Sequence, residues 1–407
     1  MSYASVRLLV GAGSRDDPRE KAGISHFVEH VIFRGTERHP HEAALRAHLA
    51  SLGIRWNART TKEWTSIDAD VPAENLLGAL RFVSEVLTTP TFNGFEIERR
   101  IVMEEMNHAY DENDGSLWPY DLFADSKMWP YGSLGIPTIG EPRTVMGISL
   151  ADVKDYLAKH YRAEGMALGI AGPVDLDAIL PELEKLFGRL PRGMPERSRK
   201  APLLQNGAMH WMHQPHSPRA HVRMMFPFSV PDHRAHLTAL FIHGLLVTEG
   251  VGRIHETLRS RTGIAYTGDS VLEVYSDCAR QTILAELKKE KMPQMVGAIA
   301  RMLRDLRYRG PTEDELEATR RIVLRDLRMT ADIPEHAAHF FAQAAVLNEP
   351  APDEAIELAQ SITMQDVVDL ARVEFRTKNA VIVVAGARDD DDQRTAWQMF
   401  EAALGGD

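Results

Sequence analysis

Two histidines and a glutamate are closely spaced near the start of the chain. Residues 22–36 read AGISHFVEHVIFRGT, in which His26, Glu29 and His30 form the pattern H-x-x-E-H. On a helix these positions fall within an arc of about 100°. Two imidazoles one turn apart can bind one cation, and histidine nitrogen is a good zinc ligand. The carboxylate beside them can take a proton from water on that cation. The alternative is a pair of surface histidines on an amphipathic helix.

Two further carboxylates lie on a second predicted helix, at residues 95–110. Glu98 and Glu105 are seven positions apart, so they lie about 20° from each other around a helix. Ile101 and Val102 are expected between them on the same face. Carboxylates on an apolar face are costly unless they are paired or bind a cation. This helix can therefore supply a third ligand; alternatively, the acids lie at the edge of the stripe and meet solvent or an arginine.

The chain contains an internal repeat. Asp152–Gly172 aligns without gaps with Asp366–Gly386, and 6 of 21 positions are identical. Glu96–Met106 aligns with Glu317–Leu327, and both segments contain Arg-Arg-Ile-Val. The offsets, 214 and 221 residues, are similar and the order is the same. This pattern predicts a duplicated unit.

The second copy serves as an internal control for the acidic pair. Thr319 and Asp326 stand where the first copy has Glu98 and Glu105, and the second half contains no H-x-x-E-H. The acids are therefore associated with the histidines and not with the fold.

Strand-like and helical segments alternate within each copy. We expect a two-layer α+β or α/β unit in each, with an N-terminal half at 1–193, a linker at 194–207 and a C-terminal half at 208–407. The linker is indicated by the Pro-, Gly- and Arg-rich composition of residues 191–207. Predicted strands include 5–10, 65–71, 166–171, 221–226 and 380–385. Predicted helices include 41–52, 74–87, 95–110, 152–161, 293–307 and 313–329.

Composition excludes several classes of protein. The 407 residues carry a formal charge of −11, which argues against nucleic acid and anionic membranes as partners. A single cysteine excludes an intrachain disulfide framework and a Cys-rich zinc ribbon. The first residues lack a signal-peptide pattern, and the longest apolar stretch, 237–247, is too short to span a bilayer. We expect a soluble, cytoplasmic protein.

These motifs resemble the pitrilysin/insulinase family of inverted-zincin metallopeptidases, in its short branch with the mitochondrial processing peptidase. The resemblance implies one Zn²⁺ per chain, a general base at Glu29 and a supporting carboxylate at Glu98. It implies zinc ligands at His26, His30 and Glu105. It is carried by H-x-x-E-H and by Gly11-Ala-Gly-Ser-Arg15, Phe33-Arg-Gly-Thr36, Asn57-Ala-Arg-Thr60 and Glu96–Met106.

The same resemblance implies residues that bind substrate. In the second half, Arg259 and Tyr266 are similar to a pair that holds the substrate backbone, with the seven-residue gap intact. Asn57 and Ala58 lie on a predicted edge strand, to which an extended peptide can add by backbone pairing. The implied α+β fold has two similar halves, each a mainly antiparallel sheet covered by helices, closing like a clamshell in a homodimer. One departure is the strand before Gly11, which is shortened to a few residues.

The expected function is therefore that of a zinc endopeptidase acting on peptides or unfolded segments inside a closed chamber. The main alternative is a catalytically inactive scaffold or assembly subunit of the same fold. A further possibility is one half of a heterodimer, although this chain carries both the zinc motif and the Arg259/Tyr266 pair, which favours pairing with itself.

Overall fold

The computed structural model describes residues 2–110, 118–197, 199, 207–214, 217, 219–248, 252–264, 267–387 and 389–405. Within this part of the chain, two compact units form. The first unit contains residues 1–119, 136–200 and 329–351, and the second contains 120–135, 201–328 and 352–407. None of the described helices has the length and apolar character that a bilayer crossing requires.

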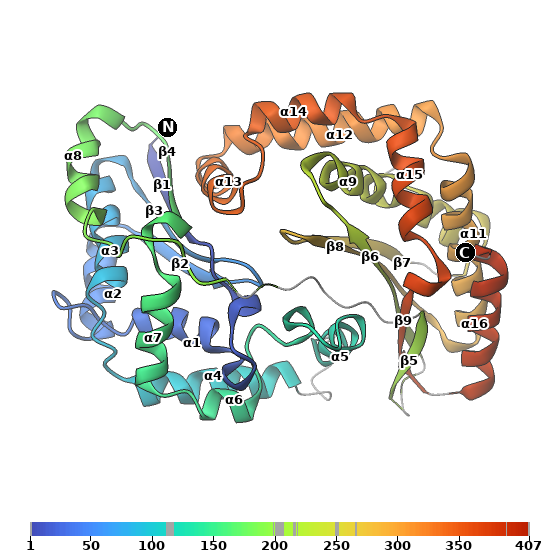
Figure 1. Cartoon of the computed structure of the whole chain (residues 1–407), viewed down its shortest axis with the longest axis horizontal. Helices are drawn as coiled ribbons and strands as arrows, with labels where there is room; N and C mark the ends of the chain where they lie inside the picture. Colours follow the sequence, from blue (N-terminus) through green and yellow to red (C-terminus); the bar gives the residue numbers. More distant parts are fainter. Residues whose placement is uncertain are drawn as a thin grey trace. The chain divides into compact units, whose positions relative to one another are not determined.

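The first unit is built on a four-stranded antiparallel sheet (Figure 1). Its strand order is β2 (Arg55–Thr60), β3 (Thr65–Pro72), β1 (Tyr3–Val10), β4 (Met166–Ala171). The first strand is longer than expected: it has eight residues, pairs with β3 along its whole length and lies inside the sheet.

Helices cover both faces of this sheet, and therefore β1 is buried on both sides. Val6 and Leu8 face the main core of the unit, whereas Leu9 packs on the other side against Ala342 and Val346 of α13 (Pro334–Leu347). The other helices of the unit are α1 (Ile24–Ile32), α2 (Glu42–Ser51), α3 (Leu76–Thr88), α4 (Phe95–Tyr110), α6 (Pro142–Met146), α7 (Leu150–His160) and α8 (Leu176–Phe187).

The second unit contains a five-stranded sheet in the order β5 (Ala208–His213), β9 (Val381–Gly386), β6 (Arg219–Ser229), β8 (Cys278–Lys288), β7 (Thr267–Val274). All its pairings are antiparallel except β5 with β9. Met224 and Phe226 of β6 face the main core, whereas Met225 packs on the opposite face with Tyr120 of α5 (Trp118–Met128). The other helices are α9 (His233–Val247), α10 (Arg253–His255), α11 (Met292–Arg309), α12 (Glu313–Asp332), α14 (Pro352–Ser361), α15 (Met364–Glu374) and α16 (Asp390–Leu404). A π-helical turn at Glu256–Arg261 follows α10.

The strand orders confirm the duplication. The order β2-β3-β1-β4 of the first sheet corresponds to β7-β8-β6-β9 of the second, to which β5 is added. Each unit also takes one helix from the other half of the sequence: α13 packs in the first unit, and α5 packs in the second. We call this arrangement the helix exchange.

Candidate active site

The H-x-x-E-H motif lies on α1. Apolar residues at helical spacing, among them Phe27, Val28 and Val31, are fully buried in the core of the first unit and hold this helix against α4 and β2. His26, Glu29 and His30 therefore lie on the part of the helix that faces α4 and β2.

The start of α1 is fixed by polar contacts. Gly23 precedes the helix with φ of 91°, and a Cβ there would lie 2.5 Å from the carbonyl oxygen of Ile139, so glycine is required. The carboxylate of Asp17 accepts hydrogen bonds from the backbone N–H groups of Gly23 and Ser25, at 2.8 and 3.2 Å. Burial raises the pKa of Asp17 well above its ordinary value, despite these hydrogen bonds.

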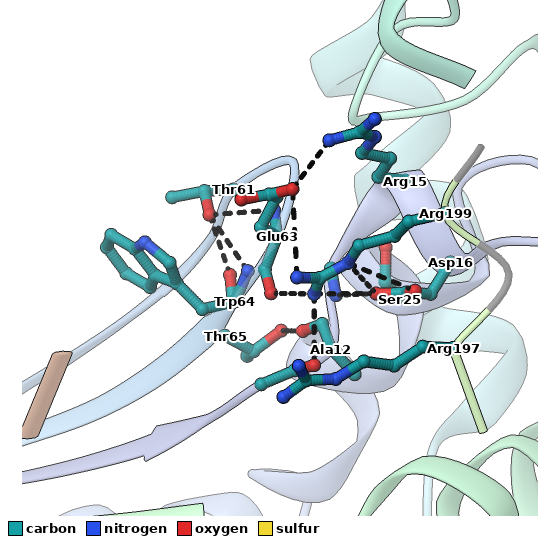
Figure 2. Close-up of polar contacts among 12 residues, drawn as sticks. Ala12, Arg15, Asp16, Ser25, Thr61, Glu63, Trp64, Thr65, Arg197 and Arg199 are labelled. Carbon is teal, nitrogen blue, oxygen red and sulfur yellow. Dashed lines mark hydrogen bonds and ion pairs between the residues drawn. The ribbon is translucent and has the colours of Figure 1, made fainter. Parts of the chain in front are cut away.

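An ion-pair network supports the loop that leads into α1. Arg199 donates to the carboxylate of Asp16 at 3.0 Å, to the carbonyl of Gly11 at 3.0 Å and to the carbonyl of Glu63 at 2.6 Å (Figure 2). Arg15 pairs with the Glu63 carboxylate at 2.7 Å. Arg199 lies within the predicted linker, yet its side chain is only 8% exposed. This arginine thus connects the loop before α1 to the β2–β3 hairpin.

His26, His30 and Glu105 come together at one point. Nε2 of His26 lies 3.8 Å from Oε1 of Glu105, and Nε2 of His30 lies 3.6 Å from Oε2. The three donor atoms all lie within 4.8 Å of one another. Two ligands held about 2.0–2.2 Å from a zinc ion can be separated by at most about 4.4 Å. The donor set, two imidazoles and one carboxylate, therefore fits zinc after a small adjustment.

Charge states differ between the two histidines. Burial, with a smaller contribution from His30, lowers the pKa of His26 to about 3, so its imidazole is neutral and has a lone pair to donate. Burial also acts to lower the pKa of His30, but the hydrogen bond to Glu98 and the carboxylates of Glu29 and Glu105 outweigh it and raise that pKa. A cation bound at this point would take the place of the proton that these carboxylates attract to His30.

Glu98 does not join the donor set. It is 6% exposed; its Oε2 lies 3.1 Å from Nδ1 of His30, and its Oε1 accepts a hydrogen bond from Nη1 of Arg34 at 3.0 Å. The two acids of α4 thus contact His30 through different ring nitrogens. The expected apolar face is formed by Val102, which is fully buried, but not by Ile101, which is 44% exposed.

Glu29 lies beside the donor set. Its Oε2 accepts a hydrogen bond from Oγ1 of Thr60 at 2.9 Å. Burial raises the pKa of Glu29, although His30 and the Thr60 hydrogen bond oppose this. A buried carboxylate whose pKa is raised toward neutrality is suited to accept and return a proton.

The expected edge strand is present as β2. It pairs with β3 and lies at one edge of the four-stranded sheet that the structure describes. Its side chains alternate between exposed and half-buried: Asn57 is exposed, whereas Ala58 packs against the core on the same side as Trp56. Asn57 and Ala58 therefore point to opposite faces of the sheet.

The proposed substrate pair of the second half is described only in part. Arg259 is exposed on the π-helical turn of the second unit, and its Nη1 lies 3.2 Å from Nε2 of His255. Tyr266 lies outside the described residues.

Two residues of the site were not expected from the sequence. Thr60 contacts Glu29, and Arg34 contacts Glu98. Both belong to segments that carry the family resemblance, Asn57-Ala-Arg-Thr60 and Phe33-Arg-Gly-Thr36. The signal was therefore present, but nothing in the spacing assigned these two side chains to partners so distant in sequence.

Two family models match the chain. Residues 2–127 match a model described as "Insulinase (Peptidase family M16)", and residues 147–323 match one described as "Peptidase M16 inactive domain". The first match contains H-x-x-E-H and Glu105. The second begins shortly before the repeated segment at Asp152 and covers most of the C-terminal half, which lacks the metal motif.

Several known proteins are similar to this chain in sequence or in fold. An "Uncharacterized zinc protease" of Rickettsia bellii is 25% identical over 94% of this chain and 92% of its own length. A probable mitochondrial-processing peptidase subunit beta of Arabidopsis thaliana is 31% identical over 46% of this chain and 35% of its own. The crystal structure of a protease from Helicobacter pylori has the same fold, with a TM-score of 0.84, 19% identity, and coverage of 95% of this chain and 94% of that one. With both of its halves matched, the chain belongs to the insulinase (M16) family of peptidases.

Proposed function

We propose that this protein is a zinc-dependent endopeptidase that hydrolyses peptides or unfolded polypeptide segments. The observation that carries the proposal is the convergence of the His26, His30 and Glu105 donor atoms, with the Glu29 carboxylate beside them. We assign one zinc ion per chain to this donor set.

Each residue has a separate task in this proposal. When bound, zinc supplies a Lewis acid that polarises the scissile carbonyl and acidifies a water molecule. Glu29 accepts the proton from that water and delivers it to the leaving amine. The hydroxyl of Thr60 holds Oε2 of Glu29 and so orients the carboxylate for this task. Glu98 holds the ring of His30 through Nδ1 and leaves Nε2 for the metal.

Substrate binding rests on the edge of the first sheet. An extended peptide can add to β2 through backbone hydrogen bonds, which read the main chain and accept varied side chains. We propose that Asn57 and Ala58 lie along this peptide, and that Arg259 and Tyr266 bind its backbone. We also propose a homodimer, because one chain carries both the zinc motif and the Arg259/Tyr266 segment.

The decisive experiment separates zinc binding from cleavage. Glu29→Gln should keep zinc, measured by elemental analysis, and should lower turnover of a quenched peptide by about a thousandfold, as expected for loss of a general base. Glu20→Gln, at an exposed position before α1, is the matched control and should cleave as the unchanged protein does. Wild-type turnover by Glu29→Gln would contradict the assignment of the base.

The same assay tests the alternative of an inactive scaffold, with which the description of the second matching family model is compatible. If the unchanged protein binds zinc but cleaves nothing in a broad peptide library, the scaffold is the correct function. Cleavage that is lost with a chelator and restored by zinc supports the peptidase.

A further inference from the structure

Arg34 links the helices that contribute the zinc donors. It follows α1 directly, and its side chain is 14% exposed. Its Nη1 contacts carboxylate oxygens of Glu98 on α4 and of Glu42 on α2. The guanidinium also lies against the start of α4: a Cβ on Gly94 would lie 2.8 Å from Nη2 of Arg34, and Gly94 has φ of 79°. The absence of a side chain at Gly94 therefore permits this close approach.

The contacts of Arg34 continue to the donor set through Glu98. The two carboxylate oxygens of Glu98 are divided between partners: Oε1 receives Arg34 at 3.0 Å, and Oε2 lies 3.1 Å from Nδ1 of His30. The opposite ring nitrogen of His30, Nε2, faces Glu105 at 3.6 Å. Because a carboxylate is planar, fixing one oxygen fixes the direction of the other. Arg34 thus constrains the rotation of Glu98, and with it the ring of His30.

The second half shows which contacts the fold needs without a metal site. Phe27, Glu96 and Arg99 correspond to Phe241, Glu317 and Arg320, and in both halves the arginine pairs with the glutamate and lies over the phenylalanine. The positions of His30, Arg34 and Glu98 are instead taken by Gly244, Thr248 and Thr319. Arg34 is therefore absent together with the histidine and the acid, and the shared fold forms without it.

We propose that Arg34 is a positioning residue for the zinc site: by holding Glu98, it orients His30 so that Nε2 faces the donor atom of Glu105. This inference rests on the proposed zinc site. Outer partners of metal ligands typically contribute about 10–100-fold to metal affinity. Arg34 contacts Glu98 and not His30 itself, so its effect on zinc affinity must pass through Glu98.

Zinc affinity, measured by competition with a chromophoric chelator, tests this proposal independently of cleavage. We expect Arg34→Ala to weaken zinc binding about tenfold or more, and Arg34→Lys to weaken it less, because a lysine can pair with one carboxylate but not fix its plane. Arg46→Ala is the matched control, because Arg46 also pairs with Glu42, at 2.6 Å, but does not contact Glu98. The zinc affinity of this variant should be unchanged.

A double-mutant cycle then separates positioning from a general loss of structure. If Arg34 acts through Glu98, adding Arg34→Ala to Glu98→Ala should cause little further loss of zinc affinity. Additive losses, or wild-type affinity in a folded Arg34→Ala protein, would overturn the proposal. If the unchanged protein itself binds no zinc, the proposed function fails, and that result is distinct from the failure of Arg34 alone.

Discussion

The two halves of the chain contain the same arginine in the same surroundings. Arg99 in the first half donates to the carbonyls of Val145 and Ile148, both at 2.7 Å. Arg320 in the second half donates to the carbonyls of Ala359 and Ile362, at 2.7 and 2.8 Å. These acceptors are related by 214 residues, the offset of the segments 152–172 and 366–386, whereas the two arginines are related by 221 residues, the offset of their own helices. The repeat is thus preserved in three dimensions at the level of single hydrogen bonds.

The helix starts that follow these carbonyls are preserved too. Asp152 of α7 and Asp366 of α15 each close a capping box, with Ser149 and Thr363 respectively, and each pairs with a cation. The pKa of each carboxyl is lowered to about 2 by hydrogen bonds. The largest contribution comes from Lys21 for Asp152 and from Arg234 for Asp366.

The halves differ where the donor set lies. Gly244 takes the position of His30, and a Cβ there would lie 2.6 Å from Cγ2 of Thr319. In the second half, α9 and α12 therefore approach closely at the place where the first half holds an imidazole and a carboxylate. The scaffold contacts are thus common to both copies, while the room and the charges needed for a metal belong to one.

The largest effect on zinc affinity should come from removing the donor Glu105, with the corresponding residue of the second half as the control. Glu105→Ala should weaken zinc binding by more than about a hundredfold, beyond what loss of an outer partner costs. Asp326→Ala, at the corresponding position of α12, should leave zinc affinity unchanged. Competition with a chromophoric chelator measures both. Equal losses in the two variants would show that the metal is not bound where we place it.

The next effect concerns the shared arginines. Arg99→Ala and Arg320→Ala should each lower the free energy of unfolding by about 3 kcal/mol, because buried or partly buried carbonyls lose their donors. Only Arg99→Ala should also weaken zinc binding, since α4 carries Glu105. The adjacent exposed positions provide controls: Arg100→Ala and Arg321→Ala should change stability by less than about 0.5 kcal/mol in urea unfolding. A large difference between Arg99→Ala and Arg320→Ala would contradict the structural equivalence of the two arginines.

A smaller effect on stability is expected at the ends of α7 and α15, where the two halves should depend on pH in opposite directions. His160 and Glu374 occupy equivalent positions and are 6% and 4% exposed. Burial lowers the pKa of His160 and raises that of Glu374 to about 7. Both groups are thus favoured in their neutral forms. The Glu374 term is fully present below pH 4.5 and is lost as the pH rises to about 7, whereas the His160 term is lost as the pH falls below 6.5.

Substitution by glutamine should remove each dependence. Glu374→Gln keeps an acceptor for the Ser229 N–H and should raise the free energy of unfolding at pH 8 by about 2–3 kcal/mol, with little change at pH 4.5. His160→Gln should instead reduce the loss of stability between pH 7 and pH 5. Urea unfolding across this range measures both. A Glu374→Gln protein with the pH profile of the unchanged chain would contradict the raised pKa.

Local patterns sufficed to predict much of the first unit. The helix at 95–110 forms with these bounds, and the strands expected at 5–10, 65–71 and 166–171 form within one or two residues of them. The grouping of His26, His30 and Glu105 followed from helical spacing together with the family resemblance. The helices and strands depend on residues within a few turns of one another, whereas the grouping of donors from two separate helices needed the family resemblance as well.

What the sequence did not reveal depends on contacts between distant segments. Ile101 has the hydrophobicity of a core residue but is 44% exposed, whereas its neighbour Val102 is fully buried in the core of the first unit. The contact of Thr60 with Glu29 requires β2 to lie beside α1, which no local pattern states. The packing of α5 and α13 was missed because the sheet that each covers lies in the other half of the sequence.

The helix exchange has a consequence for how the chain can be made. The surface of β1 that contains Leu9 is covered by α13, whose last residue is Leu347. During translation, this apolar side of β1 therefore stays uncovered until more than three hundred further residues have been added after the strand. The nascent protein thus exposes an apolar surface for most of its synthesis. Neither half completes its own core before the other has emerged from the ribosome.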